Sequence, residues 1–169
     1  MRGTAVLGED NVRLLCDEML SGVGRWLRAA GYDVAIVEAG AHDDHLLARA
    51  AAEDRVVLTC DRRLAARAGA AVAVVVLRTQ NADGAARELR ERLGIDWLHA
   101  PFTRCLRDNA TLVPADEEDV TKLPATARRA EGPVMRCPEC DRIYWPGSHV
   151  RRMRARLAKW RTASAASQW

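Results

Sequence analysis

Short apolar runs alternate with helical patterns along the first hundred residues. Runs rich in Val, Leu and Ala predict strands buried on both faces at residues 12–17, 32–37, 56–60 and 71–77. Apolar positions at helical spacing predict helices at residues 19–30, 43–53, 62–68 and 85–93. This alternation predicts an α/β fold with a doubly wound parallel sheet, in which the carboxyl ends of all strands meet at one edge.

Several residues are typical of helix ends. Gly31 and Gly94 follow two of the predicted helices and suit the left-handed position after a helix. Asp43 stands where an N-cap residue accepts a hydrogen bond from the first turn, and Asp61 has the same place before the next helix. Asp44 would favour the positive end of the helix dipole.

The pattern changes after Trp97, and we place a domain boundary near residue 98. The first domain is predicted to span residues 12–98, and the second residues 99–161. Most of the second is short, irregular and proline-containing, with an acidic run at 116–119. A helical period returns at residues 147–161 and predicts a basic C-terminal helix. Residues 1–11 and 162–169 are predicted to be loose ends.

Composition favours a globular protein with a polyanionic partner. The chain has 169 residues, 49% of them hydrophobic, and no apolar run approaches the roughly 20 residues that span a bilayer. Because the start of the sequence shows no signal-peptide pattern, we expect a cytoplasmic protein. The net charge is only +3, but the chain from residue 128 onward is strongly basic, which indicates a polyanion partner. A solvated basic tail is the alternative. The cations in this part are Arg128, Arg129, Arg136, Arg142, Arg151, Arg152, Arg154, Arg156, Lys159 and Arg161.

Three carboxylates are predicted to meet at the edge where the strands end. Asp17 and Asp61 end two strands, and Asp43 begins a helix at the same edge. Ligands of open parallel sheets bind there. Carboxylates held close together need a cation, and oxygen ligands without neighbouring His or Cys suit Mg²⁺ or Mn²⁺. We therefore predict a divalent-metal site at Asp17, Asp43 and Asp61, with Asp44 and Glu18 as substitutes. For Asp43 alone, capping is the better explanation, and it is an alternative for Asp61. The charge of Asp17 at the end of a buried strand, in contrast, is costly without a partner.

The chain has five cysteines, and three of them are spaced like metal ligands. Cys137 and Cys140 form a CxxC turn, and Cys105 has Asp108 at the same spacing. Two such knuckles about thirty residues apart predict a structural zinc ribbon with Cys₃Asp ligands. His149 is the competing fourth ligand. A lone Cys105 thiol with no bound metal is the alternative. Cys16 and Cys60 precede strand-end acids and are expected to be small buried apolar residues.

Two aromatic residues lie beside Arg142 in the second domain. Tyr144 and Trp145 are able to stack on bases while the arginine contacts phosphates. Packing in the core of the ribbon is an equally good explanation for both.

These segments together resemble a known family. They are CDEML at 16–20, RWLR at 25–28, GYD at 31–33, DDHLL at 43–47, LTCDR at 58–62, PFTRC at 101–105, CPEC at 137–140, IYW at 143–145 and GSH at 147–149. The order resembles the Mut-seven C-terminal RNase domain family over about residues 13–160. The resemblance implies a PIN-like nuclease domain with a C-terminal zinc ribbon.

The resemblance also implies residue roles. Asp17, Asp43 and Asp61 would be the acids of a metal-dependent ribonuclease, and Cys105, Cys137 and Cys140 would bind zinc. The family has Cys where this chain has Asp108. PIN nucleases often carry a fourth acid, for which Asp44, Glu18 and Asp83 are candidates.

Three functions remain open from the residues. The first is Mg²⁺- or Mn²⁺-dependent hydrolysis of RNA. Phosphates would be contacted by Arg25, Arg62 and Arg63 near the acids, and by Arg151, Arg152 and Arg154 on the basic helix. The second is a phospho-signalling receiver, which requires a lysine near the site, whereas this chain has none before Lys122. The third is a non-catalytic RNA-binding module with a degraded nuclease site.

Overall fold

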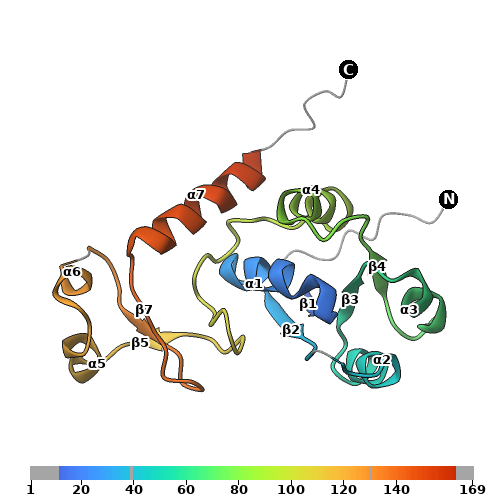
Figure 1. Ribbon diagram of the computed structural model, residues 1–169, viewed down its shortest axis with the longest axis horizontal. Helices are drawn as coiled ribbons and strands as arrows, with labels where there is room; N and C mark the ends of the chain where they lie inside the picture. Colours follow the sequence, from blue (N-terminus) through green and yellow to red (C-terminus); the bar gives the residue numbers. More distant parts are fainter. Residues whose placement is uncertain (1–11, 39, 130, 163–169) are drawn as a thin grey trace.

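A four-stranded parallel sheet forms the centre of the first part of the molecule (Figure 1). The computed structural model describes residues 12–38, 40–129 and 131–162, so most of the predicted loose ends lie outside the described residues. The strands are β1 (Arg13–Cys16), β2 (Asp33–Ile36), β3 (Val56–Thr59) and β4 (Val74–Val76), in the order β2-β1-β3-β4. All three pairings are parallel, which confirms the sheet predicted from the apolar runs. The fourth strand is shorter than predicted because a turn takes up residues 69–71.

Helices cover both faces of this sheet. A short 3-10 helix, η1 (Glu18–Leu20), leads into α1 (Ser21–Ala29), and α2 (Asp43–Ala52), α3 (Arg62–Arg67) and α4 (Ala82–Leu93) follow. Leu14 of β1 packs in one buried cluster with Leu27 of α1 and Leu89 of α4. The next residue, Leu15, packs in a second cluster with the side chains of α2 and α3. Successive strand residues point to opposite faces, so each face of the sheet packs against its own pair of helices.

The helix ends confirm some boundary predictions and correct others. Gly31 follows α1 with φ +100°, and a β-carbon there would lie 2.3 Å from the carbonyl oxygen of Ala100. Gly94 ends α4 in the left-handed conformation. The prediction that Asp43 caps α2 was wrong, because His42 has the extended N-cap backbone and Asp43 lies inside the first turn. Asn81 caps α4, which therefore begins three residues before the predicted start.

The second part contains a small antiparallel sheet. Its strands are β5 (Val113–Pro114), β6 (Met135–Arg136) and β7 (Ile143–Tyr144), in the order β5-β6-β7. Two short helices, α5 (Glu117–Thr121) and α6 (Ala125–Arg128), lie between β5 and β6. The acidic run forms the start of α5, because the side chain of Asp116 accepts a hydrogen bond from the Asp119 amide. The segment that was expected to be irregular thus contains short helices and strands.

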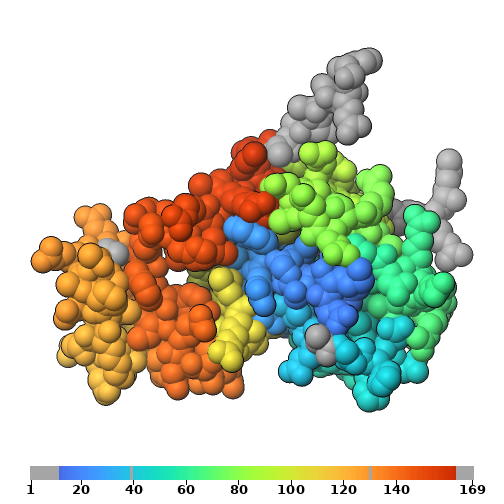
Figure 2. Space-filling model, viewed as in Figure 1, coloured from blue at the N-terminus to red at the C-terminus, as the bar shows by residue number. Residues whose placement is uncertain are grey.

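The basic helix α7 (Ser148–Thr162) returns to the first part and packs over α1 and α4 (Figure 1, Figure 2). Trp160, near its end, is 5% exposed and lies in edge-to-face contact with Trp26 and Trp97. Its indole N–H donates to Asp83 at 2.6 Å. The division at residue 98 stays a prediction, and the last helix belongs to the core of the first part.

The edge of the parallel sheet is closed by side chains on both sides of residue 98. On the outer side of β2, the amide of Val34 donates to Asn109 Oδ1 at 2.9 Å, and its carbonyl accepts from Arg28 Nε at 2.8 Å. The same Arg28 guanidinium donates to the carbonyls of Leu106 at 3.0 Å and Arg107 at 2.6 Å. An exposed edge strand is a site of unwanted pairing. These contacts block that edge and fix the loop after residue 104 against it.

We expect Trp160→Ala to lower the free energy of unfolding by about 3–5 kcal/mol, because it removes a buried ring that joins α7 to the core. Trp160→Phe keeps an aromatic ring and should lose less. The exposed Lys159→Ala is the control and should stay within about 0.5 kcal/mol of wild type. Urea unfolding followed by circular dichroism measures all three. Equal stabilities of Trp160→Ala and Lys159→Ala would show that α7 is not part of the core.

Candidate functional site

Two of the predicted acids follow neighbouring central strands at the carboxyl edge of the sheet. Asp17 follows β1, Asp61 follows β3, and these strands are hydrogen-bonded neighbours. The Thr59 hydroxyl donates to Asp17 Oδ2, and Thr59 Oγ1 accepts from the Asp61 amide at 2.9 Å. After β1, the chain adds β2 on one side of that strand, and it then adds β3 and β4 on the other side. The pair therefore lies at the point where the direction of strand order reverses, which is where open α/β sheets bind ligands.

Asp17 is a buried carboxylate. Its residue is 7% exposed, its Oδ1 accepts from the Leu20 amide at 3.0 Å, and within the described residues no ion pair includes it. Burial raises the pKa of Asp17, against the opposite effect of the hydrogen bonds from Thr59 and the backbone. The ionised form therefore costs folding free energy at neutral pH.

The other acids at this edge are engaged elsewhere. Asp43 and Asp44 both pair with Arg67 of α3, the former at 2.7 Å between Oδ2 and Nη1. The Glu18 carboxylate accepts from the Gly40 amide at 2.7 Å, so it fastens the loop that leads to α2. Asp61 Oδ1 accepts from the Arg63 amide at 2.7 Å, as its predicted capping role requires.

The three predicted metal-binding aspartates do not converge in this structure. Among the residues that the structure describes, one group of three or more His, Cys, Asp or Glu has its ligand atoms within 4.8 Å of one another, and it contains none of Asp17, Asp43 and Asp61. Their shared role in binding a divalent ion stays a prediction. Asp83, a candidate fourth acid, is held by the indole of Trp160 and by Arg156.

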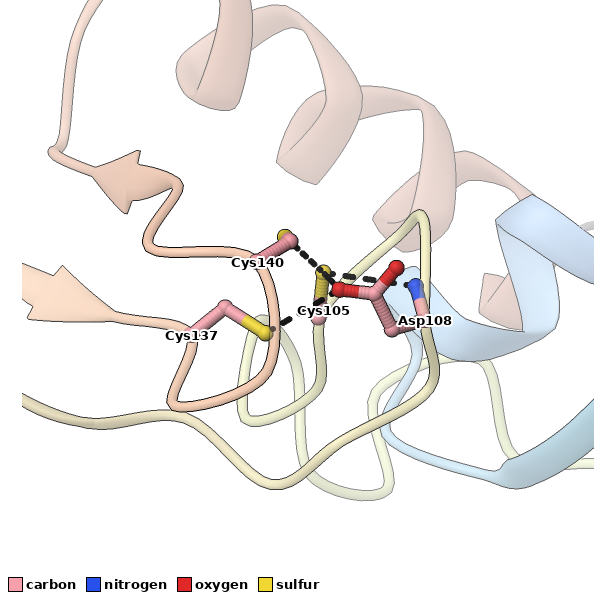
Figure 3. Close-up of side chains that lie close together, drawn as sticks. All are labelled: Cys105, Asp108, Cys137 and Cys140. Atoms are coloured by element: carbon pink, nitrogen blue, oxygen red, sulfur yellow. Dashed lines mark hydrogen bonds between the residues drawn. The ribbon is translucent and has the colours of Figure 1, made fainter.

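The convergent group is the predicted Cys₃Asp set. Cys105, Asp108, Cys137 and Cys140 point toward one another from the loop before β5 and the turn after β6 (Figure 3). Sγ of Cys105 lies 3.8 Å from Sγ of Cys140. Asp108 Oδ2 lies 3.4 Å from the Cys105 sulfur and 3.3 Å from the Cys137 sulfur.

These distances fit a tetrahedral metal centre. Metal–sulfur bonds of about 2.3 Å and metal–oxygen bonds of about 2.0 Å give ligand separations of about 3.8 Å between sulfurs and about 3.5 Å between sulfur and oxygen. His149 is outside the group, so Asp108 is the residue that completes it. Four protein ligands leave no open position, which is typical of structural rather than catalytic metal sites.

Tyr144 lies beside the Cys₃Asp group and supports its interpretation as a metal site. The Leu106 amide donates to the Tyr144 hydroxyl at 3.1 Å, which leaves the hydroxyl proton for the Cys105 sulfur at 3.1 Å. Burial raises the pKa of the Cys105 thiol, but the hydrogen bonds from Tyr144 and the backbone outweigh it and lower that pKa. A thiolate is the form that binds metal. For Tyr144, packing in the ribbon is therefore the interpretation that the structure supports.

The predicted phosphate contacts occupy two surfaces. Arg25 is exposed on α1, and Arg62 and Arg63 are exposed at the start of α3, next to Asp61. On α7, Arg151 and Arg152 are exposed, and the guanidinium of Arg154 lies 5.1 Å from the centre of the Phe102 ring. Their contacts with RNA stay predictions.

Sequence reasoning missed Thr59, Arg28 and Arg67, which act through residues far away along the chain. No local pattern marks such side chains, although Thr59 lies two residues before a strand-end acid. Cys16 is fully buried, as expected, and burial raises the pKa of its thiol. Cys60 is half-buried.

Comparison with known families gave one finding. The model of a family described as "Mut7-C RNAse domain" matches residues 12–157, which is most of the chain. Comparisons with curated proteins and with solved structures gave no match. In the described residues, no helix has the length and apolarity that crossing a membrane requires.

We expect the purified chain to carry one metal ion in the Cys₃Asp group. Cys137→Ser should lower both the metal content and the melting temperature, because the group substitutes for a core that this small segment lacks. Asp108→Cys should retain the metal, since a fourth thiolate fits the same geometry. Inductively coupled plasma mass spectrometry measures the metal, with Cys60→Ser as the control. Unchanged metal content in Cys137→Ser would contradict the assignment.

We expect Asp17→Asn to raise the melting temperature at pH 7 in buffer free of divalent ions. The pKa of Asp17 is higher in the folded protein than in the unfolded chain. The free energy of unfolding of the wild type therefore falls as the pH rises from about 3.9, the ordinary pKa of an aspartate, to the higher pKa of Asp17 in the folded protein. The difference between variant and wild type should vanish below that range. Thermal melts at pH 3.5 and 7 measure it, and the exposed Asp54→Asn is the control. A variant less stable than wild type at both pH values would refute this prediction.

Proposed function

Because the chain belongs to the Mut7-C RNAse domain family, we propose that it is a metal-dependent ribonuclease that hydrolyses RNA phosphodiester bonds at its strand-end aspartates. The observation that carries this proposal is the buried Asp17, which has no cationic partner within the described residues and shares Thr59 with Asp61. A carboxylate that costs stability at a ligand-binding edge is typical of a functional site.

We propose these roles for the residues at the edge. Asp17 and Asp61 hold Mg²⁺ or Mn²⁺, and Asp43 completes the shell or orients water once Arg67 releases it. Asp44 and Glu18 are substitutes for a ligand. A bound divalent ion supplies charge stabilisation and lowers the pKa of water. Thr59 fixes the Asp17 carboxylate, and Arg62 and Arg63 are positioned to contact the phosphate beside Asp61.

In the second part, Zn²⁺ is the metal that we propose for the Cys₃Asp group. Its role is structural, and the group with its three short strands forms a zinc ribbon that follows a PIN-like domain. The ribbon and the basic face of α7 would increase affinity for RNA, with Arg151, Arg152 and Arg154 as contacts. Thiolate ligands favour Zn²⁺ over Mg²⁺ or Mn²⁺, so the two proposed centres select different ions.

One observation favours a second candidate function. Asp43 and Asp44 both pair with Arg67, and in the described residues the three aspartates do not converge. A chain in which this pairing persists would be a non-catalytic RNA-binding module. The two candidates differ in one property, which is cleavage of RNA that depends on a divalent ion.

The test is cleavage of end-labelled single-stranded RNA in Mn²⁺, with samples in EDTA as controls. Asp17→Asn and Asp61→Asn should each lower the rate at least about 100-fold, as expected for removal of a group that acts on the reacting centre. Asp54→Asn, an exposed acid at the opposite end of the sheet, should cleave like wild type. Equal cleavage by wild type and Asp17→Asn, or none by either, rejects the nuclease, whereas salt-sensitive RNA binding without cleavage supports the second candidate.

A further inference from the structure

A groove of about 1140 Å³ runs between the α/β part and the ribbon. Its walls come from α1 and the end of β2 on one side, and from β7, the start of α7 and the loop after Cys105 on the other. The volume exceeds the roughly 300–1,000 Å³ typical of small-molecule pockets, so an extended ligand fits it better than a metabolite.

Besides the buried Arg28, three exposed arginines line this groove, which we call the arginine groove. They are Arg25 of α1, Arg107 of the loop after Cys105 and Arg142 before β7, and all are exposed. Within the described residues, none of the three forms an ion pair or a side-chain hydrogen bond, unlike Arg55 and Arg67. Glu18 and Glu38 also line the groove, but in the described residues neither forms an ion pair with these arginines. The guanidinium groups therefore remain available to attract a polyanion and to make bidentate contacts with phosphate.

Ring faces lie beside these charges. Trp145 and His149 line the groove, the first half-buried and the second exposed. Alternation of arginine with rings is the arrangement by which proteins hold single-stranded nucleic acid, since bases stack on the rings while the backbone follows the charges. A duplex keeps its bases stacked on one another and leaves such rings without a partner.

The groove also reaches the segment that directly follows Asp17. Glu18, which directly follows Asp17, lines it together with Ser21 and Arg25. A nucleic-acid strand that enters over Trp145 and passes Arg142 and Arg25 would therefore reach the carboxyl end of β1.

We propose that the arginine groove binds single-stranded RNA several nucleotides long and delivers it to Asp17. This inference deepens the proposed function and rests on it for the identity of the polyanion. It assigns contacts to Arg107, Arg142, Trp145 and His149, and it places the bound strand between the two parts of the molecule rather than along the outer face of α7.

The experiment measures binding of a fluorescein-labelled eight-nucleotide RNA to the full chain by fluorescence anisotropy, without Mg²⁺ or Mn²⁺ and over a range of salt concentrations. Arg142→Ala should weaken binding and reduce the slope of log K against log salt by about 0.7, the value for one phosphate contact on a single strand. Trp145→Ala should weaken binding about fivefold or more, and Trp145→Phe should restore it. The exposed Arg87→Ala on α4 is the matched control and should change neither quantity. The same RNA in a duplex should bind more weakly.

Each result decides the matter. Groove variants that bind like Arg87→Ala, while wild type still cleaves RNA, overturn the groove and leave the proposed function. Groove-dependent binding without any cleavage supports the groove and rejects the nuclease. An acidic peptide that binds the groove while RNA does not overturns the inference.

Discussion

The buried guanidinium of Arg28 holds together the two parts on which every site in this molecule depends. It is 5% exposed and has no carboxylate partner in the described structure; three backbone carbonyls surround it instead. Burial lowers the pKa of Arg28, but an arginine keeps its charge in proteins, so the carbonyls must remain in place. Two of them belong to Leu106 and Arg107, between the metal-group residues Cys105 and Asp108. The charge on α1 thus fixes the position of the metal group relative to the sheet, and with it one wall of the arginine groove.

Much of the α/β part follows from local patterns. Continuous apolar runs such as 56–59 specify buried parallel strands, and Gly31 and Gly94 mark helix ends, because these signals depend on neighbours within a few residues. The location of Asp17 and Asp61 at one edge of the sheet also follows, since neighbouring strands of a parallel sheet end at the same edge. The CxxC spacing identifies the turn that brings Cys137 and Cys140 into the Cys₃Asp group for the same local reason.

What escaped sequence reasoning depends on contacts between distant segments. Strands of two residues, such as 113–114 and 135–136, have no period to detect, because only their pairing within a sheet defines them. His42 rather than Asp43 caps α2, and Arg67 takes the Asp43 carboxylate that would otherwise be free. Arg107 carries no local signal in the sequence, and Arg142 is marked only by the two aromatic residues beside it. Their common groove appears only when the loop held by Arg28 is placed beside β7.

The ion pair between Arg67 and Asp43 would compete only weakly with a catalytic ion for the Asp43 carboxylate. Both side chains are nearly half exposed, at 48% and 41%, and ion pairs of this kind contribute at most about 1 kcal/mol. The buried Asp17 carboxylate gains far more from a cation, because desolvation raises its energy and Arg67 does not reach it in this structure. A divalent ion at Asp17 and Asp61 would therefore compete for Asp43 from a stronger electrostatic position than a single exposed arginine.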